Sequence, residues 1–252
     1  MAIWTPDALR SELRPASGAA WRLVEAQHRI STLKLVDGLA EYAALESILE
    51  DSKPAVPVDC RGLDYLLYSP FRHGQYPNGS RFRRAGVTPG VFYCSTNIGT
   101  AVAETAFYRL LFFADSPATP WPRNALEFTA IQIRYATQHL LDLGGPPLNV
   151  DAPLWTDPGD HGPTQQLADD ARQAGAQVLR YTSVRDPGHR ANIALLTGAA
   201  FARKVPVARS HWQLFLSASG VVALADRPAA TLFFGHRAFD PDSRISAMRW
   251  HR

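Results

Sequence analysis

One carboxylate stands out among the side chains that could do chemistry. Glu104 lies in a stretch of helical character over residues 97–113, and its neighbours three and four positions away are Ala101, Phe107, Thr100 and Tyr108. None of them is a cation, although glutamate on an exposed helix face commonly pairs with one. Because burial without a partner is costly, Glu104 lies either at the helix margin or in a pocket.

An arginine-rich turn is the second candidate. The segment SPFRHGQYPNGSRFRR (residues 69–84) carries Arg72, Arg81, Arg83 and Arg84 beside Phe71, Tyr76 and Phe82. Guanidinium groups next to aromatic rings can clamp phosphates and stack on a base or ribose. The alternative interpretation is a solvated basic loop.

Other nucleophile and metal patterns are weaker. Ser183 ends a strand pattern beside a Gly/Pro turn, but no G-x-S-x-G surrounds it, so a hydrolase triad is not predicted. The eight histidines show no HxxxH or HxH spacing, and Cys60 and Cys94 have no metal-ligand spacing. We therefore predict no metal site and a reducing, cytoplasmic location.

The composition is that of an ordinary soluble chain. Of 252 residues, 46% are hydrophobic and 19% are charged, which excludes disorder for most of the chain. No apolar run approaches the roughly 18 residues of a membrane span, and the first residues do not resemble a secretory signal. A net charge of +3 is too small to indicate nucleic acid, and codon preference explains most of the excess of arginine over lysine.

The elements that must position these side chains divide the chain in two. Leucines at near-helical spacing predict a helix over residues 17–52, and Pro54 and Pro57 end it. We therefore expect an N-terminal helical extension over residues 1–57 and a second domain over residues 58–252.

The second domain mixes strands and helices. Strands are predicted at 63–68, 90–94 and 127–135, and a helix at 95–115 with Ser95, Thr96 or Asn97 as its cap. After a loop-rich region (144–163), a polar helix ends at Gly175, and further strands follow. Short strands with few helices predict an α+β fold. No glycine-rich phosphate loop is present.

The ordered set of arginine turn, strand, glutamate helix and late strand resembles the RES-domain family. The matching stretches are GSRFRRAGVTPGVFYCSTNIGTAVAETAFYR and GAQVLRYTSVRDPGHRANIAL. The resemblance implies a fold like that of the ADP-ribosyltransferases, a mixed or antiparallel sheet core with flanking helices. It also implies consumption of NAD⁺ without a metal, by phosphorolysis, hydrolysis or ADP-ribosyl transfer, and pairing of a toxin with an Xre-type antitoxin.

The same resemblance assigns site residues. Glu104 and Ser183 match the family's glutamate and serine, and Arg72 is assigned as its first arginine, with Arg22 and Arg29 as rivals. The NAD⁺-binding set is Arg81, Tyr93 and Asn192. The chain departs from the family by its long N-terminal extension and by GSRF where relatives often have GGRW.

Two functions of different classes are therefore expected. The first is an NAD⁺-degrading enzyme that cleaves the nicotinamide–ribose bond, the toxin of a bacterial toxin–antitoxin pair. The alternative is a nucleic-acid-binding module or ribonuclease that uses the basic loop at 72–84. A blander interpretation is a partner-binding protein without turnover, whose N-terminal helix docks a partner or forms a homodimer.

Overall fold

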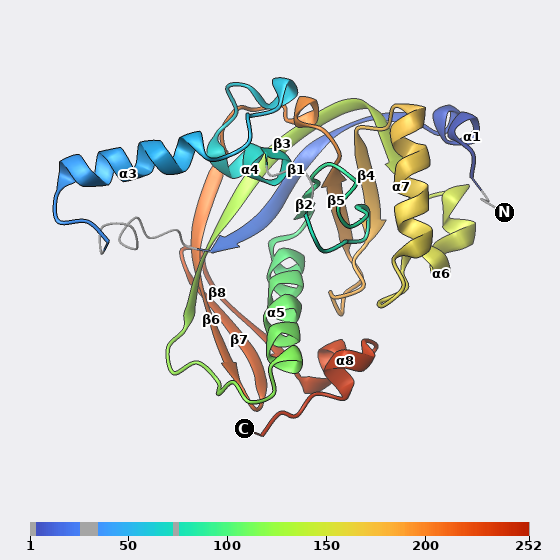
Figure 1. Cartoon of the computed structure of the whole chain (residues 1–252). Helices are drawn as coiled ribbons and strands as arrows, with labels where there is room; N and C mark the ends of the chain where they lie inside the picture. The colour runs from blue at the N-terminus through green and yellow to red at the C-terminus, as the bar shows by residue number, and fades with distance from the viewer. Residues whose placement is uncertain (1–3, 26–34, 73–75, 252) are drawn as a thin grey trace.

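The computed structural model describes residues 4–25, 35–72 and 76–251 (Figure 1). A curved eight-stranded sheet forms its centre. The strands are β1 (Arg14–Glu25), β2 (Phe92–Ser95), β3 (Leu126–Asp142), β4 (Val178–Thr182), β5 (Ala191–Leu195), β6 (Ala208–Ser217), β7 (Gly220–Asp226) and β8 (Ala229–Gly235). The helices are α1 (Pro6–Ser11), α3 (Leu39–Asp51), α4 (Tyr65–Arg72), α5 (Ile98–Asp115), α6 (Ala152–Trp155), α7 (Gly162–Ala174) and α8 (Ser243–Ser246).

The sheet closes partly on itself. Its order is β1-β2-β5-β4-β3-β6-β7-β8, and β1 also pairs with β3. The pairings therefore close a ring of five strands, β1-β2-β5-β4-β3, from which β6–β8 extend as an antiparallel meander. Within the described residues, every pairing is antiparallel except that of β3 with β4. The α+β class and the sheet core with flanking helices are confirmed.

The prediction of one N-terminal helix over 17–52 is wrong in its first part. Residues 14–25 form β1, which pairs with β3 along almost its whole length and joins β2 through Trp21 and Ser95. Long-range pairing of this kind overrides weak local helix propensity. The second part is helical, as α3, and no residue of α3 is buried; it projects from the body of the molecule in Figure 1. The positions 26–34 of that prediction lie outside the described residues.

The strand predicted at 63–68 is also wrong, because α4 begins at Tyr65. Asp64 accepts hydrogen bonds from the backbone at the start of this helix, which satisfies N–H groups that a helix start leaves without partners. The C-terminal end of α4 approaches the chain before β2 so closely that a Cβ on Gly90 would lie 1.6 Å from the carbonyl oxygen of Pro70.

Other predictions are confirmed. The strand at 90–94 is β2, and the helix at 95–115 is α5, whose N-terminus is capped by the Asn97 side chain. The strand at 127–135 is the middle of the longer β3. The polar helix is α7, and Gly175 ends it in the left-handed conformation with φ of 90°, which glycine adopts without strain.

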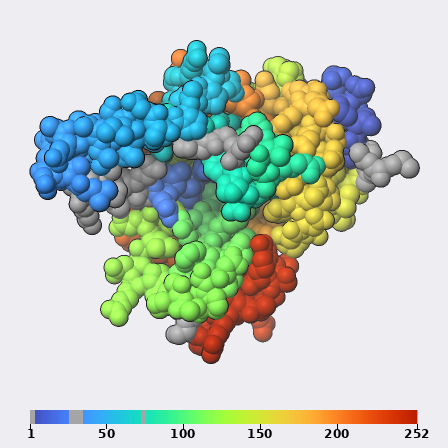
Figure 2. Space-filling model, in the orientation of Figure 1, coloured from blue at the N-terminus to red at the C-terminus, as the bar shows by residue number. Residues whose placement is uncertain are grey.

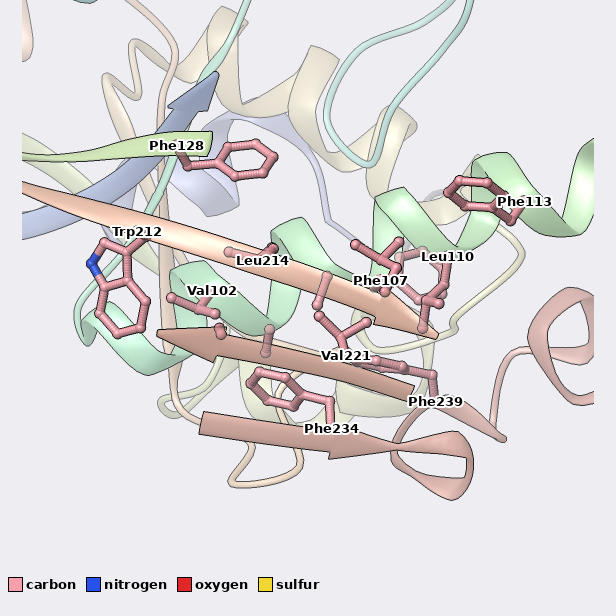
Figure 3. Close-up of a cluster of buried hydrophobic side chains, with 14 of the residues drawn as sticks. Val102, Phe107, Leu110, Phe113, Phe128, Trp212, Leu214, Val221, Phe234 and Phe239 are labelled. Atoms are coloured by element: carbon pink, nitrogen blue, oxygen red, sulfur yellow. The ribbon is translucent and has the colours of Figure 1, made fainter. Parts of the chain in front are cut away.

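Three apolar clusters hold the layers together. In one, α5 packs on β6–β8, where Phe107 and Leu110 lie near Val221 and Phe239 (Figure 3). A second joins α7 to β4 and β5, and a third fills the interior of the strand ring around Ile131. Because α5 and β5 are both fixed by buried packing, the polar side chains that they carry are held rigidly.

In the described ranges no helix is long and apolar enough to cross a membrane.

Candidate active site

A cleft of about 2140 Å³ opens between α3, α5 and the segment that precedes β2. Figure 2 shows the surface hollowed between α3 and α5. Its lining carries both charges, with several arginines and with carboxylates that include Glu46 and Glu50 of α3. The polar residues of its inner wall are Arg22, Ser80, Arg81, Arg83, Tyr93, Ser95, Glu104, Arg185 and Asn192.

Glu104 is held by two hydrogen bonds to the same carboxylate oxygen. The hydroxyl of Ser183 and the Nδ2 of Asn192 each donate to its Oε1 over 2.6 Å. Glu104 is half-buried and lines the cleft. The sequence pattern allowed Glu104 to lie either at the helix margin or in a pocket, and the geometry is that of a pocket. The hydrogen-bond partners of the carboxylate come from β5 and from the end of β4, not from its own helix.

Ser183 is completely buried, with 0% of its surface exposed. Its oxygen accepts hydrogen bonds from the backbone N–H groups of Arg185 and Asp186, so its own proton is directed at Glu104. Ser183 is not among the residues that line the cleft. It contacts the carboxylate from behind.

The turn that carries Ser183 is tied to α5 by Asp186. Its carboxylate accepts from Thr100 of α5 and from Arg190. Burial alone would raise the pKa of Asp186, but the hydrogen bonds from Arg190, Thr100 and Gly188 outweigh burial and hold that pKa well below its usual range. This ionised group fixes the distance between the serine and the glutamate helix.

The structure separates two of the three candidates for the first arginine, Arg22 and Arg72. The guanidinium of Arg72 is buried against the end of α3, where it donates to the carbonyl of Pro54 and to Glu50, and Arg72 does not line the cleft. Arg22 on β1 does line it; its guanidinium lies 4.8 Å from the centre of the Phe92 ring and donates to the carbonyl of Tyr93. Arg29 lies outside the described residues.

Arg81 lines the cleft, but its two terminal nitrogens are engaged with the loop before α7. They donate to the backbone carbonyls of Trp155 and Asp157 over 2.8 and 2.9 Å. Arg185 holds the same loop through the carbonyl of Pro158 and pairs with Asp242 at 3.0 Å. These two arginines fix the loop at the edge of the cleft.

Tyr93 also lines the cleft, although its hydroxyl is occupied. That hydroxyl lies 2.9 Å from the Ser80 hydroxyl and accepts from the backbone N–H of Phe82. Burial raises the pKa of Tyr93. The tyrosine therefore orders the arginine-rich turn and presents its ring to the cleft.

Sequence reasoning did not single out three cleft residues. Arg185 lies in the SVRDPG stretch, two residues after Ser183, and this closeness in sequence could have identified it as a site residue. Ser95 was considered only as a helix cap, whereas it bonds Asn192. No sequence pattern identified His161 as a site residue. In the structure, burial together with the charges of Arg81, Arg185 and Arg244 lowers the pKa of its imidazole to about 4.

Comparison with known proteins identifies the family. The RES domain model matches residues 56–217, which is more than half of the chain. The chain belongs to the RES-domain family. No curated protein matches it. One similar solved structure is a chain of the MbcT–MbcA toxin–antitoxin complex of M. tuberculosis, with 11% identity, a TM-score of 0.45, and coverage of 80% of this chain and 91% of that chain.

The matched RES domain contains most of the site. Arg81, Tyr93, Glu104, Ser183 and Asn192 fall within it. The match does not reach β1 or α3, although β1 supplies Arg22 to the cleft and completes the strand ring. Among the described residues, no group of three or more His, Cys, Asp or Glu side chains is placed to hold a metal ion.

Proposed function

We propose that this RES domain is an NAD⁺-degrading enzyme that cleaves the nicotinamide–ribose bond, with Glu104 as its catalytic carboxylate. The observation that carries the proposal is a glutamate at the inner wall of a large cleft, fixed through Oε1 by two buried donors. Cations line the same wall, as an anionic dinucleotide requires.

The geometry suits the chemistry of that bond. Nicotinamide leaves NAD⁺ as a neutral ring that keeps the electron pair of the broken C–N bond, so positive charge develops on the ribose. A carboxylate held close to the ribose stabilises this charge, as in glycoside cleavage. The oxygen of phosphate, of water or of a protein side chain then bonds the ribose carbon and loses its proton.

We propose that Arg22 and Arg83, rather than Arg72, bind the pyrophosphate of NAD⁺. Arg22 is the arginine that β1 brings to the cleft. Arg83 stacks on the Tyr76 ring at 4.2 Å, and its Nη1 is a buried donor without a hydrogen-bond partner among the described residues. An anionic oxygen would satisfy such a donor. Arg81 acts by holding the 155–158 loop, and Ser183 acts by holding Glu104.

We assign the Tyr93 ring to stacking on the nicotinamide, and Asn192 to holding Glu104 toward the ribose. In keeping with the family resemblance, we further propose that the protein is the toxin of a toxin–antitoxin pair, which acts in the cytoplasm and is neutralised by an Xre-type antitoxin.

The nucleic-acid alternative gains no support from the arginines on which it depended. Arg72 and Arg81 are buried, with 6% and 8% exposed. Arg84 is paired with Asp169 at 2.6 Å, and Arg83 lies against Tyr76. The described residues of this segment therefore present no continuous basic stripe of the kind that tracks a phosphate backbone.

The test is incubation of the protein with NAD⁺ and phosphate, with separation of the products. We expect nicotinamide release, and a loss of about 100-fold or more in kcat for Glu104→Gln, because the amide keeps the shape but not the charge. ADP-ribose-1″-phosphate, ADP-ribose and modified protein distinguish phosphate, water and protein acceptors.

Glu41→Gln is the matched control, since Glu41 is an exposed carboxylate of α3 outside the cleft lining. It should keep full activity. Equal turnover by Glu104→Gln and the unaltered protein would overturn the assignment.

A further inference from the structure

A second serine, Ser95, is connected to the catalytic carboxylate through Asn192. Its hydroxyl donates to Oδ1 of Asn192 over 2.6 Å, and Nδ2 of Asn192 donates to Glu104 over the same distance. Ser95 and Asn192 are each 2% exposed. The three side chains thus form one line of hydrogen bonds, from β2 through β5 to α5.

Strand register places the two residues together. Ser95 and Asn192 are direct partners in the antiparallel pairing of β2 with β5, and side chains of directly opposed residues lie on the same face at contact distance. The pair is therefore set by the sheet itself. Ser95 is also two residues before the Asn97 cap of α5, so the start of the glutamate helix is fixed to the same strand.

The direction of the line follows from the chemistry of its groups. An ionised carboxylate only accepts hydrogen bonds, so Asn192 must turn Nδ2 toward Glu104 and leave Oδ1 on the opposite side. A buried amide oxygen without a donor costs free energy, and the Ser95 hydroxyl supplies the donor. Hydrogen bonds in such a chain also polarise one another.

Both donors to Glu104 use Oε1. The described residues make no hydrogen bond to Oε2, so Oε2 is the oxygen that remains for a substrate in the cleft. Any loss of the Asn192 contact would leave Ser183 as the sole side-chain donor on Oε1 and allow the carboxylate to rotate about it.

We propose that Ser95 is a positioning residue that acts through the Asn192 amide, so that Glu104 presents Oε2 to the ribose of the substrate. The effect of Ser95 on catalysis rests on the proposed function. The hydrogen bonds from Ser95 to Asn192 and from Asn192 to Glu104 are independent of that function and can be measured without turnover.

The experiment compares Ser95→Ala with Thr96→Ala. Thr96 is the matched control, because its hydroxyl also bonds β5, at the carbonyl of Ala191, but it is exposed and does not line the cleft. We expect Ser95→Ala to lower kcat about tenfold with KM for NAD⁺ changed less than about twofold, the pattern of lost positioning. Thr96→Ala should keep both constants, and Ser95→Thr, which restores a hydroxyl, should recover part of the kcat.

The second readout is the side-chain amide signal of Asn192 in a ¹H–¹⁵N NMR spectrum, assigned by its disappearance in Asn192→Asp. In the unaltered protein, we expect these amide protons to be protected from exchange with solvent, and in Ser95→Ala we expect the protection to be lost. This measurement reports the hydrogen bond from the Asn192 amide to Glu104, which we expect Ser95 to orient, and it requires no substrate.

The outcomes separate the two proposals. Loss of protection together with lower kcat supports the positioning role. Loss of protection in a protein that never turns over NAD⁺ supports the hydrogen-bond line and overturns the proposed function. Unaltered kcat in Ser95→Ala, a raised KM alone, or an Asn192 amide that exchanges equally fast in both proteins would overturn the role of Ser95.

Discussion

Arg22 and Arg72 have opposite surroundings. Arg22 lies over the Phe92 ring at the cleft and donates to one carbonyl, that of Tyr93, whereas Arg72 donates to both Pro54 and Glu50 at the end of α3. A guanidinium that already serves a carbonyl and a carboxylate has few donors left for a phosphate, so the first is suited to a ligand and the second to holding structure.

Substitution by methionine tests this difference, because it keeps much of the aliphatic stem and removes the guanidinium. Arg22→Met should raise KM for NAD⁺ about tenfold or more, as expected for a lost phosphate contact. Arg72→Met should lower Tm by about 2–4 °C and leave KM unaltered. Steady-state kinetics and thermal unfolding of both variants check the prediction. A raised KM in Arg72→Met, with Arg22→Met unaffected, would restore the assignment made from the sequence.

The site residues differed in how far the sequence could identify them. Glu104 could be identified from the sequence, because its lack of cationic neighbours along one helix can be read from the residue spacing. The partnership of Ser183 and Asn192 was not, since it needs the turn after β4 and the register of β5 against β2. A linear motif gives residue types, while hydrogen-bond direction depends on which groups face each other.

Among the secondary-structure elements, β1 differs most from the sequence-based prediction, which was a helix. A stretch with the Ala-rich, mixed composition of a helix forms a strand because β3 offers a long edge, and eleven register pairs join them. β1 also connects β3 to β2 and thereby closes the strand ring. Neither feature can be detected from local periodicity.

A chain that begins at residue 58 should therefore fail to fold cooperatively. It would lose β1, leave one edge of β3 without partners and open the ring, which exposes backbone groups and core side chains. Far-UV circular dichroism and urea unfolding measure this outcome.

By contrast, Ile48→Ser in α3 should leave the free energy of unfolding within about 0.5 kcal/mol, because Ile48 is 66% exposed. A cooperative transition for the shortened chain would show instead that residues 58–252 form an independent domain, as the sequence suggested.

At the scale of the whole molecule, charges buried near the cleft make stability depend on pH. The pKa of His161 is lowered to about 4, so the folded protein holds this imidazole neutral while the unfolded chain protonates it near pH 6.5. Between these values, the unfolded state binds more protons, and stability must fall as the pH falls.

We expect His161→Gln to lose less stability than the unaltered protein between pH 6.5 and about 4, by at most about 1.4 kcal/mol per pH unit. Below that range, both proteins should lose stability together, as the buried carboxylates of Asp186 and Asp242, whose pKa values are held below the usual range, become protonated. Urea unfolding at a series of pH values measures the difference. Parallel curves across pH 6.5 to 4 would contradict it.

The sequence by itself determined the α+β class, the family, the glutamate helix with its cap, and the polar helix that ends at Gly175. These follow from local periodicity, capping chemistry and motifs, which are properties of neighbouring residues. Only the tertiary structure decided that residues 14–25 are a strand, that Arg22 and not Arg72 lies in the cleft, and that Ser95 stands behind Asn192. The physical reason is that strand pairing and burial join residues far apart in the chain, and their free energies outweigh local preference.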